Sequence, residues 1–310
     1  MRMVKRMVLG LVAALILCLA GLLGVKGCCD ARYYHGYDPD APLNAVIRGT
    51  EDRPGYRRVD LTFEGVPGQP VPTLLALPRE GEGPFPCIVF LHGIGQKKDF
   101  LDEIAAPFVE AGFAMVSSDQ YTRGERRLDG AGPLTEMLRM RRRAALNVLE
   151  TRRLVDYLVT RPDIAADRLY LVGASFGAIT GSTAAAFEKR FKAVVLVYGG
   201  GNLRVLLASD GVREEAGDWT DVVARAGAFI MAPADPLRHV HEIAPRPVLL
   251  QNGKHDSLIP AVTAQALFDA AREPKEIIWY DSDHVGLDER QTWQVLNEAL
   301  AWLKRQDGGS

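Results

Sequence analysis

The stretch Arg168-Leu-Tyr-Leu-Val-Gly-Ala-Ser-Phe-Gly177 decides the fold of this chain. Its apolar half, residues 169–172, is typical of a buried strand, and the alanine-rich residues from 178 onward are typical of a helix. Only Gly-Ala-Ser-Phe-Gly lies between the two elements, so the chain must turn sharply there. The pattern Gly-x-Ser-x-Gly lets strand and helix approach closely around an exposed serine, and it predicts that Ser175 is a nucleophile.

A nucleophilic serine needs a base to take its proton and an acid to orient that base. In strand–turn–helix sites of this kind the three groups follow in the order serine, acid, histidine. Four histidines follow Ser175, and His284 comes shortly after the apolar run 276–280. We therefore predict that His284 is the base, on the loop that leaves the last strand. His239 and His241 lie in an expected helical turn, where a packing or surface role is more typical.

The acid is expected at the end of the apolar run 247–252. Asp256 lies just past this predicted strand, where ligand-facing groups collect in open α/β sheets. It would accept the second ring N–H of the histidine and stabilise the imidazolium. Asp281 and Asp283 are the competitors, but their closeness to His284 in sequence would require an unusual loop. The sequence therefore favours Asp256.

The negative oxygen that forms in such chemistry needs two N–H donors. The amide of Phe176 is one candidate, because it lies at the start of the predicted helix. The amide of Ile94 is the other, within the glycine-rich segment 92–95 that follows the buried run 86–91. His92 is expected to hydrogen-bond this loop rather than to transfer protons.

Together these residues amount to a family resemblance. The chain resembles the α/β-hydrolase superfamily, and within it the dienelactone-hydrolase-like and acetyl-xylan-esterase-like esterases, with kinship to prolyl-oligopeptidase catalytic domains. The resemblance rests on His92-Gly-Ile-Gly95, Ser118-Asp119, Tyr121-Thr-Arg-Gly124, Asp163-Ile-Ala-Ala-Asp-Arg168, Gly173-Ala-Ser-Phe-Gly177, Ala244-Pro-Arg-Pro-Val248, Asp256 and His284. It implies a hydrolase with Ser175, Asp256 and His284 as its catalytic triad and with no cofactor or metal.

The expected fold is an α/β-hydrolase fold, with a mostly parallel central sheet and helices on both faces. Strands are expected at 56–63, 73–77, 87–91, 113–117, 169–172, 193–198, 248–252 and 276–280. The first two, joined around Pro67-Gly68, predict an antiparallel edge hairpin. We expect residues 51–310 to form the catalytic domain, residues 29–50 a tether or wrapping arm, and residues 199–243 a cap over the site.

The N-terminus predicts an exported protein. Basic residues at positions 2, 5 and 6 precede an apolar run from 7 to 25, which is typical of an export signal. Val25-Lys-Gly-Cys28 resembles a bacterial lipobox with Cys28 as the lipidated residue, although Lys26 fits that motif poorly. An uncleaved membrane anchor and ordinary cleavage are the alternatives. Residues 1–28 are therefore expected to tether the protein to the membrane of the cell envelope.

The sequence as a whole favours a serine esterase. The net charge of −2 over 310 residues gives no reason to expect a nucleic-acid partner. We expect a small-molecule or acylated substrate, and a thioesterase, amidase, peptidase or non-catalytic envelope binding protein remains the alternative. The arginines at 139 and 141–143 would either recognise an anionic acyl group or phosphate, or form a solvated helix face paired with Glu136 or Glu150.

Overall fold

The computed structural model describes residues 17–18, 20–130, 132–286 and 288–308. Contacts divide the chain into two compact units, Met1–His35 and Gly36–Ser310. In the first unit, residues 17–18 and 20–31 are helical, and most of the predicted apolar leader lies outside the described residues. No helix in the described ranges combines the length and the apolar character that a membrane span requires. The export signal and the lipobox stay predictions.

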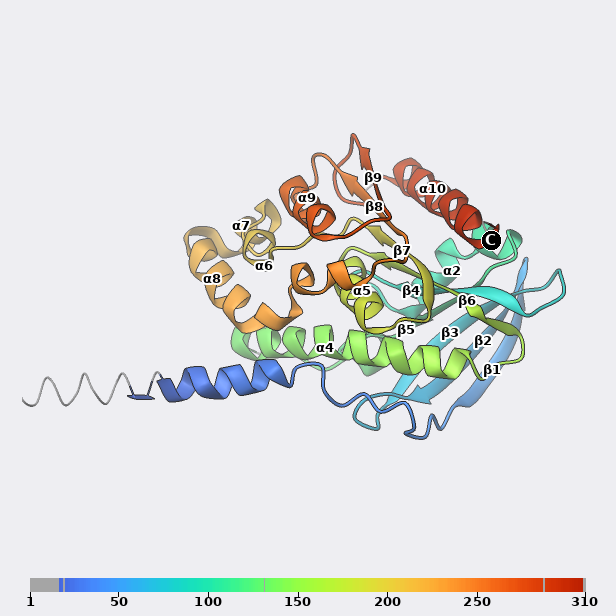
Figure 1. Ribbon diagram of the computed structural model, residues 1–310, viewed down its shortest axis with the longest axis horizontal. Coiled ribbons are helices and arrows are strands. Elements are labelled where there is room, and N and C mark those ends of the chain that lie inside the picture. Colours follow the sequence, from blue (N-terminus) through green and yellow to red (C-terminus); the bar gives the residue numbers. More distant parts are fainter. Residues whose placement is uncertain (1–16, 19, 131, 287, 309–310) are drawn as a thin grey trace, which may run out of the picture. The chain divides into compact units, whose positions relative to one another are not determined.

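One mixed sheet organises the second unit (Figure 1). Its nine strands in the described chain are β1 (Val46–Arg53), β2 (Tyr56–Glu64), β3 (Pro70–Pro78), β4 (Phe85–Leu91), β5 (Ala114–Ser118), β6 (Ile164–Ala174), β7 (Phe191–Val197), β8 (Val248–Gly253) and β9 (Lys275–Tyr280). They lie in the order β1-β2-β3-β5-β4-β6-β7-β8-β9. Along this order, the pairs β1·β2, β2·β3 and β3·β5 are antiparallel. The remaining pairs, from β5·β4 to β8·β9, are parallel. Every predicted strand is present, and the mostly parallel sheet confirms the predicted fold class.

The edge of the sheet differs from the prediction. The hairpin of β2 and β3 forms as expected, but β1 pairs antiparallel with β2 and takes the edge position. Nearly every residue of β1 is exposed, so its sequence carries no alternation of buried and exposed positions from which a strand could be predicted. Arg48 secures this strand through ion pairs with Asp60 of β2 and Glu125.

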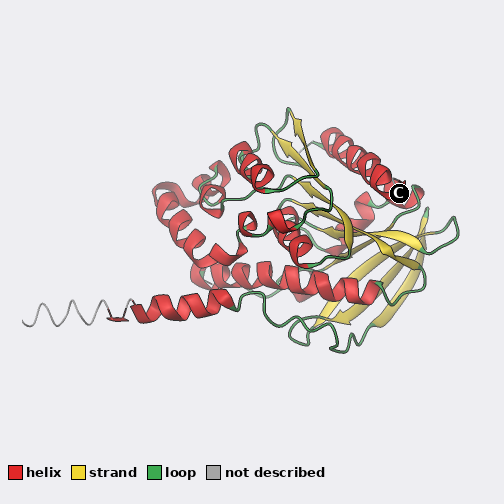
Figure 2. Cartoon of the chain, in the orientation of Figure 1, coloured by secondary structure: helices red, strands yellow, loops and turns green. Residues whose placement is uncertain are grey.

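Helices cover both faces of the sheet (Figures 1 and 2). On one face lie the short helices α2 (Leu101–Ile104) and α3 (Ala106–Glu110) and the C-terminal helix α10 (Glu289–Gly308). Their side chains, Phe108 and Trp302 among them, share a buried core with Ile88 and Val172 of the central strands. On the other face lie α4 (Pro133–Leu158), α5 (Phe176–Phe187) and α9 (Ala261–Ala270). This alternation follows from the two-residue period of strands that are buried on both faces.

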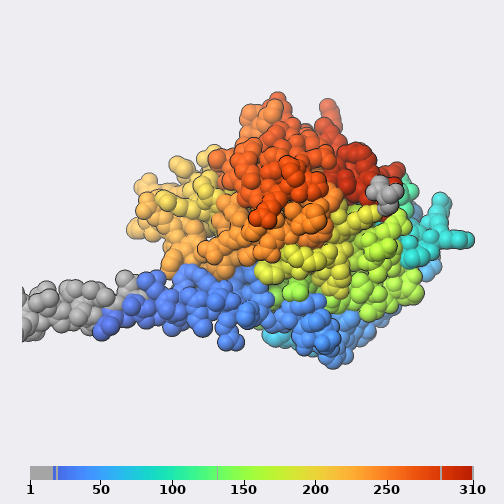
Figure 3. Space-filling view, in the orientation of Figure 1, coloured from blue at the N-terminus to red at the C-terminus, as the bar shows by residue number. Residues whose placement is uncertain are grey.

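The segment between β7 and β8 folds into short helices. These are α6 (Leu203–Leu206), α7 (Asp210–Ala216) and α8 (Thr220–Met231), and the segment also contains 3₁₀ turns at Gly217–Trp219, Ala232–Ala234, Pro236–Arg238 and Val240–Glu242. Two further 3₁₀ turns lie earlier in the chain, at Lys98–Phe100 and Gly124–Arg126. His239 and His241 lie in or beside the turn Val240–Glu242, as predicted. Figure 3 shows the orange and red last third of the chain packed against yellow and green segments from its middle.

Candidate functional site

Ser175 occupies a strained turn between β6 and α5. Its backbone has φ 54° and ψ −118°, a conformation that L-residues rarely adopt. The flanking glycines make this turn sterically accessible: a Cβ on Gly177 would lie 1.9 Å from the carbonyl oxygen of Leu91, and one on Gly173 would lie 2.3 Å from that of Gly177. The Ser175 N–H donates to the carbonyl of Val197 at 2.8 Å, which ties the turn to β7. The Gly-x-Ser-x-Gly pattern is therefore required by close backbone packing.

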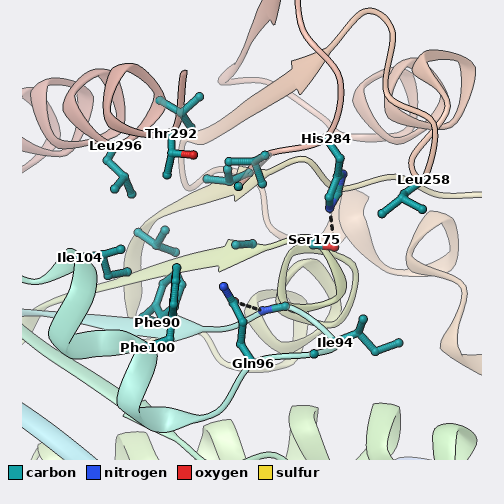
Figure 4. A pocket seen from close by; sticks show the side chains of 18 residues that line it. Phe90, Ile94, Gln96, Phe100, Ile104, Ser175, Leu258, His284, Thr292 and Leu296 are labelled. Carbon is teal, nitrogen blue, oxygen red and sulfur yellow. Dashed lines mark hydrogen bonds between the residues drawn. The ribbon is translucent and has the colours of Figure 1, made fainter. Parts of the chain in front are cut away.

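A line of hydrogen bonds joins the three residues predicted to react together. His284 Nε2 lies 3.0 Å from Ser175 Oγ, and His284 Nδ1 lies 2.7 Å from Asp256 Oδ2 (Figure 4 shows the first contact). Because the carboxylate can only accept, Nδ1 carries the proton and Nε2 offers its lone pair to the serine hydroxyl. The ring of Tyr198 meets the imidazole edge-on, with centroids 5.7 Å apart. This geometry suits proton transfer from Ser175 to His284.

Asp256 is held as an acceptor by its own loop. Its carboxyl side chain has no solvent exposure. Oδ1 accepts the N–H groups of Leu258 at 2.8 Å and Ile259 at 2.7 Å, which leaves Oδ2 for the histidine. The β8–α9 connection therefore fixes this carboxylate in place.

The competing acids have other partners. Asp281 pairs with the exposed His255 at 2.8 Å. Asp283 accepts from the N–H and hydroxyl of Ser257 and from the N–H of His284, and the Ser257 N–H is the main cause that lowers the pKa of Asp283. Asp283 thus organises the loop that carries the histidine, while Asp256 contacts the ring.

The loop after β4 lies against the serine. A Cβ on Gly93 would lie 3.6 Å from Ser175 Cβ, and the carbonyl of Gly93 accepts His92 Nδ1–H at 2.8 Å and the N–H of Gln96 at 3.3 Å. In a trans peptide the N–H points opposite to the carbonyl, so these bonds fix the direction of the Ile94 N–H. The pKa of His92 is lowered because its burial disfavours the charged ring. His92 therefore acts as a neutral donor to the loop, as the sequence predicts.

Two arginines hold the same loop, a role that the sequence did not predict for them. The carbonyl of Ile94 accepts Arg123 Nε–H at 2.6 Å and Arg143 Nη2–H at 3.1 Å. Arg143 is 1% exposed, and its guanidinium lies 4.7 Å from the ring centroid of Phe176. Burial lowers the pKa of Arg143 to about 9, so the group stays cationic at neutral pH. One buried cation thus contacts both residues predicted to donate to the oxyanion.

The other arginines of helix α4 do not converge on a shared anion site. Arg139 pairs with Glu136 at 2.7 Å, as expected if these arginines form a solvated helix face rather than an anion site. The guanidinium of Arg142 lies 4.8 Å from the ring centroid of Tyr121. Glu150 instead pairs with Arg126, at 2.6 Å. The cluster in the sequence is therefore distributed around the helix.

An apolar cavity of about 230 Å³ opens beside Ser175 and His284. Among the described residues, none from 199–243 lines it. That segment instead borders an open depression of about 620 Å³ that reaches Asp256 and contains Arg204 and Arg213. In the described ranges, no group of three or more His, Cys, Asp or Glu side chains is arranged to hold a metal ion. The predicted cap thus does not form the walls of the apolar cavity.

Comparison with known proteins places the chain among hydrolases. The sequence model of acetyl xylan esterase (AXE1) matches residues 42–199, and that of the prolyl oligopeptidase family matches residues 149–310, each just over half of the chain. The Escherichia coli (strain K12) esterase YjfP is 23% identical over 76% of this chain and 95% of its own length. The Bacillus subtilis (strain 168) putative hydrolase YtaP is 24% identical over 61% of this chain and 67% of its own.

Solved structures show the same fold. The acetyl xylan esterase from Paenibacillus sp. R4 aligns with TM-score 0.69 and 20% identity over 90% of this chain and 92% of its own. Acetyl xylan esterase 1 from Thermoanaerobacterium sp. JW/SL YS485 aligns with TM-score 0.71 and 19% identity over 90% of this chain and 93% of its own. At these identities the likeness establishes the α/β-hydrolase fold.

Proposed function

Because this chain belongs to the α/β-hydrolases of the acetyl xylan esterase and prolyl oligopeptidase families, we propose that it hydrolyses carboxylic esters through an acyl-enzyme on Ser175. The observation that carries the proposal is the line of hydrogen bonds from Ser175 through His284 to Asp256. The strained backbone at Ser175 supports it, since such strain persists mainly at functional positions.

The reaction follows from the placement of these groups. Ser175 Oγ attacks the ester carbon while His284 Nε2 takes its proton, and the buried carboxylate of Asp256 stabilises the imidazolium. The N–H groups of Phe176 and Ile94 hold the negative oxygen of the tetrahedral intermediate. As the intermediate collapses, the C–O bond to the alcohol breaks and His284 gives its proton to the departing oxygen. Water then repeats the sequence on the acyl-enzyme and releases the acid.

An ester is preferred over an amide or a thioester because the relatives named above include esterases. A peptidase is the second candidate, since the prolyl oligopeptidase match covers Ser175, Asp256 and His284. A non-catalytic envelope binding protein is disfavoured, because such a protein has no need of a complete and strained nucleophile site.

A fluorophosphonate probe tests the nucleophile. The native protein should be labelled and Ser175→Ala should not, while Ser182→Ala, which removes a buried serine of the same helix, should keep the labelling. Failure to label the native protein would refute the proposal and favour the binding protein. Labelling together with faster hydrolysis of prolyl peptide amides than of p-nitrophenyl esters would replace the esterase with a peptidase.

We also propose that the protein is exported and tethered to the membrane by its N-terminus, on the basis of the leader-like residues 1–28. If Cys28 is lipidated, mass spectrometry of the mature protein should find an acylated N-terminal cysteine, and Cys28→Ser should block processing. Recovery of an intact residue 7–25 segment in the membrane fraction of both proteins would show an uncleaved anchor instead. Recovery of all activity in the cytoplasmic fraction would contradict both.

A further inference from the structure

The cavity beside Ser175 has apolar walls. Its lining side chains in the described chain are Phe90, Ile94, Gln96, Phe100, Ile104, Val172, Ala174, Ser175, Val197, Leu258, His284, Val285, Thr292, Val295 and Leu296. None of these is a carboxylate, a lysine or an arginine. The hydroxyl of Thr292 donates to the carbonyl of Asp288, and Gln96 Oε1 accepts the N–H of Gly93. The cavity therefore suits a hydrocarbon group better than a sugar or an anionic group.

The cavity has a closed end and an open end. At the closed end, Phe90, Ile104 and Val295 are at most 3% exposed. At the open end, Ile94 and Leu258 are 44% and 46% exposed. In Figure 4, Ser175 and His284 lie between Phe90 and Ile104 on one side and Ile94 and Leu258 on the other. An ester bound at Ser175 thus has one arm in the closed end and the other toward solvent.

The order in which bonds break decides whether the acyl chain or the alcohol of the ester occupies the closed end. The alcohol must depart while the acyl group is still attached to Ser175 Oγ. An alcohol lodged in the closed end would have its exit blocked by that acyl group. The closed end therefore receives the acyl chain, and the alcohol leaves past Leu258.

From this geometry we propose that the preferred substrates are esters of medium-chain fatty acids, with the chain in the cavity that Phe100, Ile104 and Thr292 border. The proposal rests on the proposed serine-esterase function. The volume is about 230 Å³, whereas a cavity of about 150 Å³ in another protein holds the six carbons of benzene. Part of the present volume belongs to the mouth, so acyl chains of roughly four to eight carbons should fill it. An acetyl group would leave most of it empty.

A series of p-nitrophenyl esters from acetate to dodecanoate tests the acyl preference. Each buried methylene is worth about 0.8 kcal/mol, so kcat/KM should rise about fourfold per methylene until the cavity is full, and then level off or fall. A parallel series of ethyl to hexyl acetates should show no such increase. A rise with the length of the alcohol but not of the acyl chain would overturn the assigned orientation.

Thr292→Trp tests the cavity itself. The indole should fill space beside Leu296, lowering kcat/KM for octanoate at least tenfold while changing that for acetate less than threefold. The matched control is Asn297→Trp, which places the same side chain on the exposed face of α10 and should change neither. Phe100→Ala, which enlarges the cavity, should move the preferred chain length upward by about two carbons. Acetate turnover by each variant shows that it has folded.

The outcomes separate this proposal from the one on which it rests. Absence of Ser175-dependent hydrolysis of every ester would refute the esterase function. Hydrolysis with acetate as the best substrate, or equal effects of Thr292→Trp on acetate and octanoate, would refute the acyl-chain proposal alone.

Discussion

Replacing Asp256 with asparagine changes only one atom, but the surrounding hydrogen bonds dictate how the new side chain must lie. Oδ1 of Asp256 accepts two N–H groups, from Leu258 and Ile259, at 2.8 and 2.7 Å. An amide NH₂ placed there would face two donors, so the amide oxygen must keep this position. The NH₂ group then faces His284 Nδ1, which can only accept from it.

This arrangement disables the base through its tautomer. With Nδ1 as an acceptor, the proton moves to Nε2, which then donates to Ser175 Oγ and cannot take the hydroxyl proton. The corresponding substitution in serine proteases lowers kcat about 10⁴-fold, or about 5.4 kcal/mol. We expect a loss of about 10³- to 10⁴-fold in kcat for a p-nitrophenyl ester. Thermal unfolding should change little, because both backbone hydrogen bonds are retained.

Asp283→Asn is the matched control. Asp283 accepts from the Ser257 N–H and hydroxyl and from the His284 N–H, and an amide oxygen can accept from the same groups. Its kcat should therefore stay within about tenfold of the native value, well short of the loss expected without the triad acid. If Asp283→Asn lost activity while Asp256→Asn kept it, the acid would be misassigned.

Three further substitutions probe the supports of the site. Arg143→Met should lower kcat about 10- to 100-fold with little change in KM, because a charge-assisted hydrogen bond to the Ile94 carbonyl is lost. Arg139→Met is the control and should leave kcat unchanged. Equal losses in the two variants would contradict a role of Arg143 at the loop after β4. Gly177→Ala should yield no soluble active protein, since its Cβ would lie 1.9 Å from the carbonyl oxygen of Leu91. Gly49→Ala is the control and should stay active, because its Cβ would meet no atom within 4 Å. An active Gly177→Ala protein would contradict the packing argument. Burial lowers the pKa of His92. Below the ordinary pKa of histidine, the unfolded chain therefore binds a proton at this residue that the native ring does not bind. The native state should then lose up to about 1.4 kcal/mol per pH unit through this residue as the pH falls below about 6.5, and His92→Asn should reduce that slope in urea unfolding.

Much of the architecture could be predicted from local patterns. The buried strands are near-continuous apolar runs, and the Gly-x-Ser-x-Gly turn identifies the junction of β6 and α5 because only glycine fits where backbones nearly touch. Strand β1 escaped prediction because its exposed residues carry no periodic signal, and only its pairing with β2 defines it.

For the candidate site, too, some features could be predicted from the sequence and others required the tertiary structure. The sequence by itself predicted the chemical types and the order of Ser175, Asp256 and His284, since groups of these types recur in this order at the ends of parallel strands in such folds. The sequence favoured Asp256, but only the tertiary structure shows that Asp256 and not Asp283 contacts the imidazole ring, because that depends on which carboxylate the β8 loop turns toward it. The contact of Arg143 with the Ile94 carbonyl could not be predicted either, since 49 residues of chain separate the two. Residue types are local properties of a sequence, whereas distances of a few ångströms between remote side chains arise only when the sheet has formed.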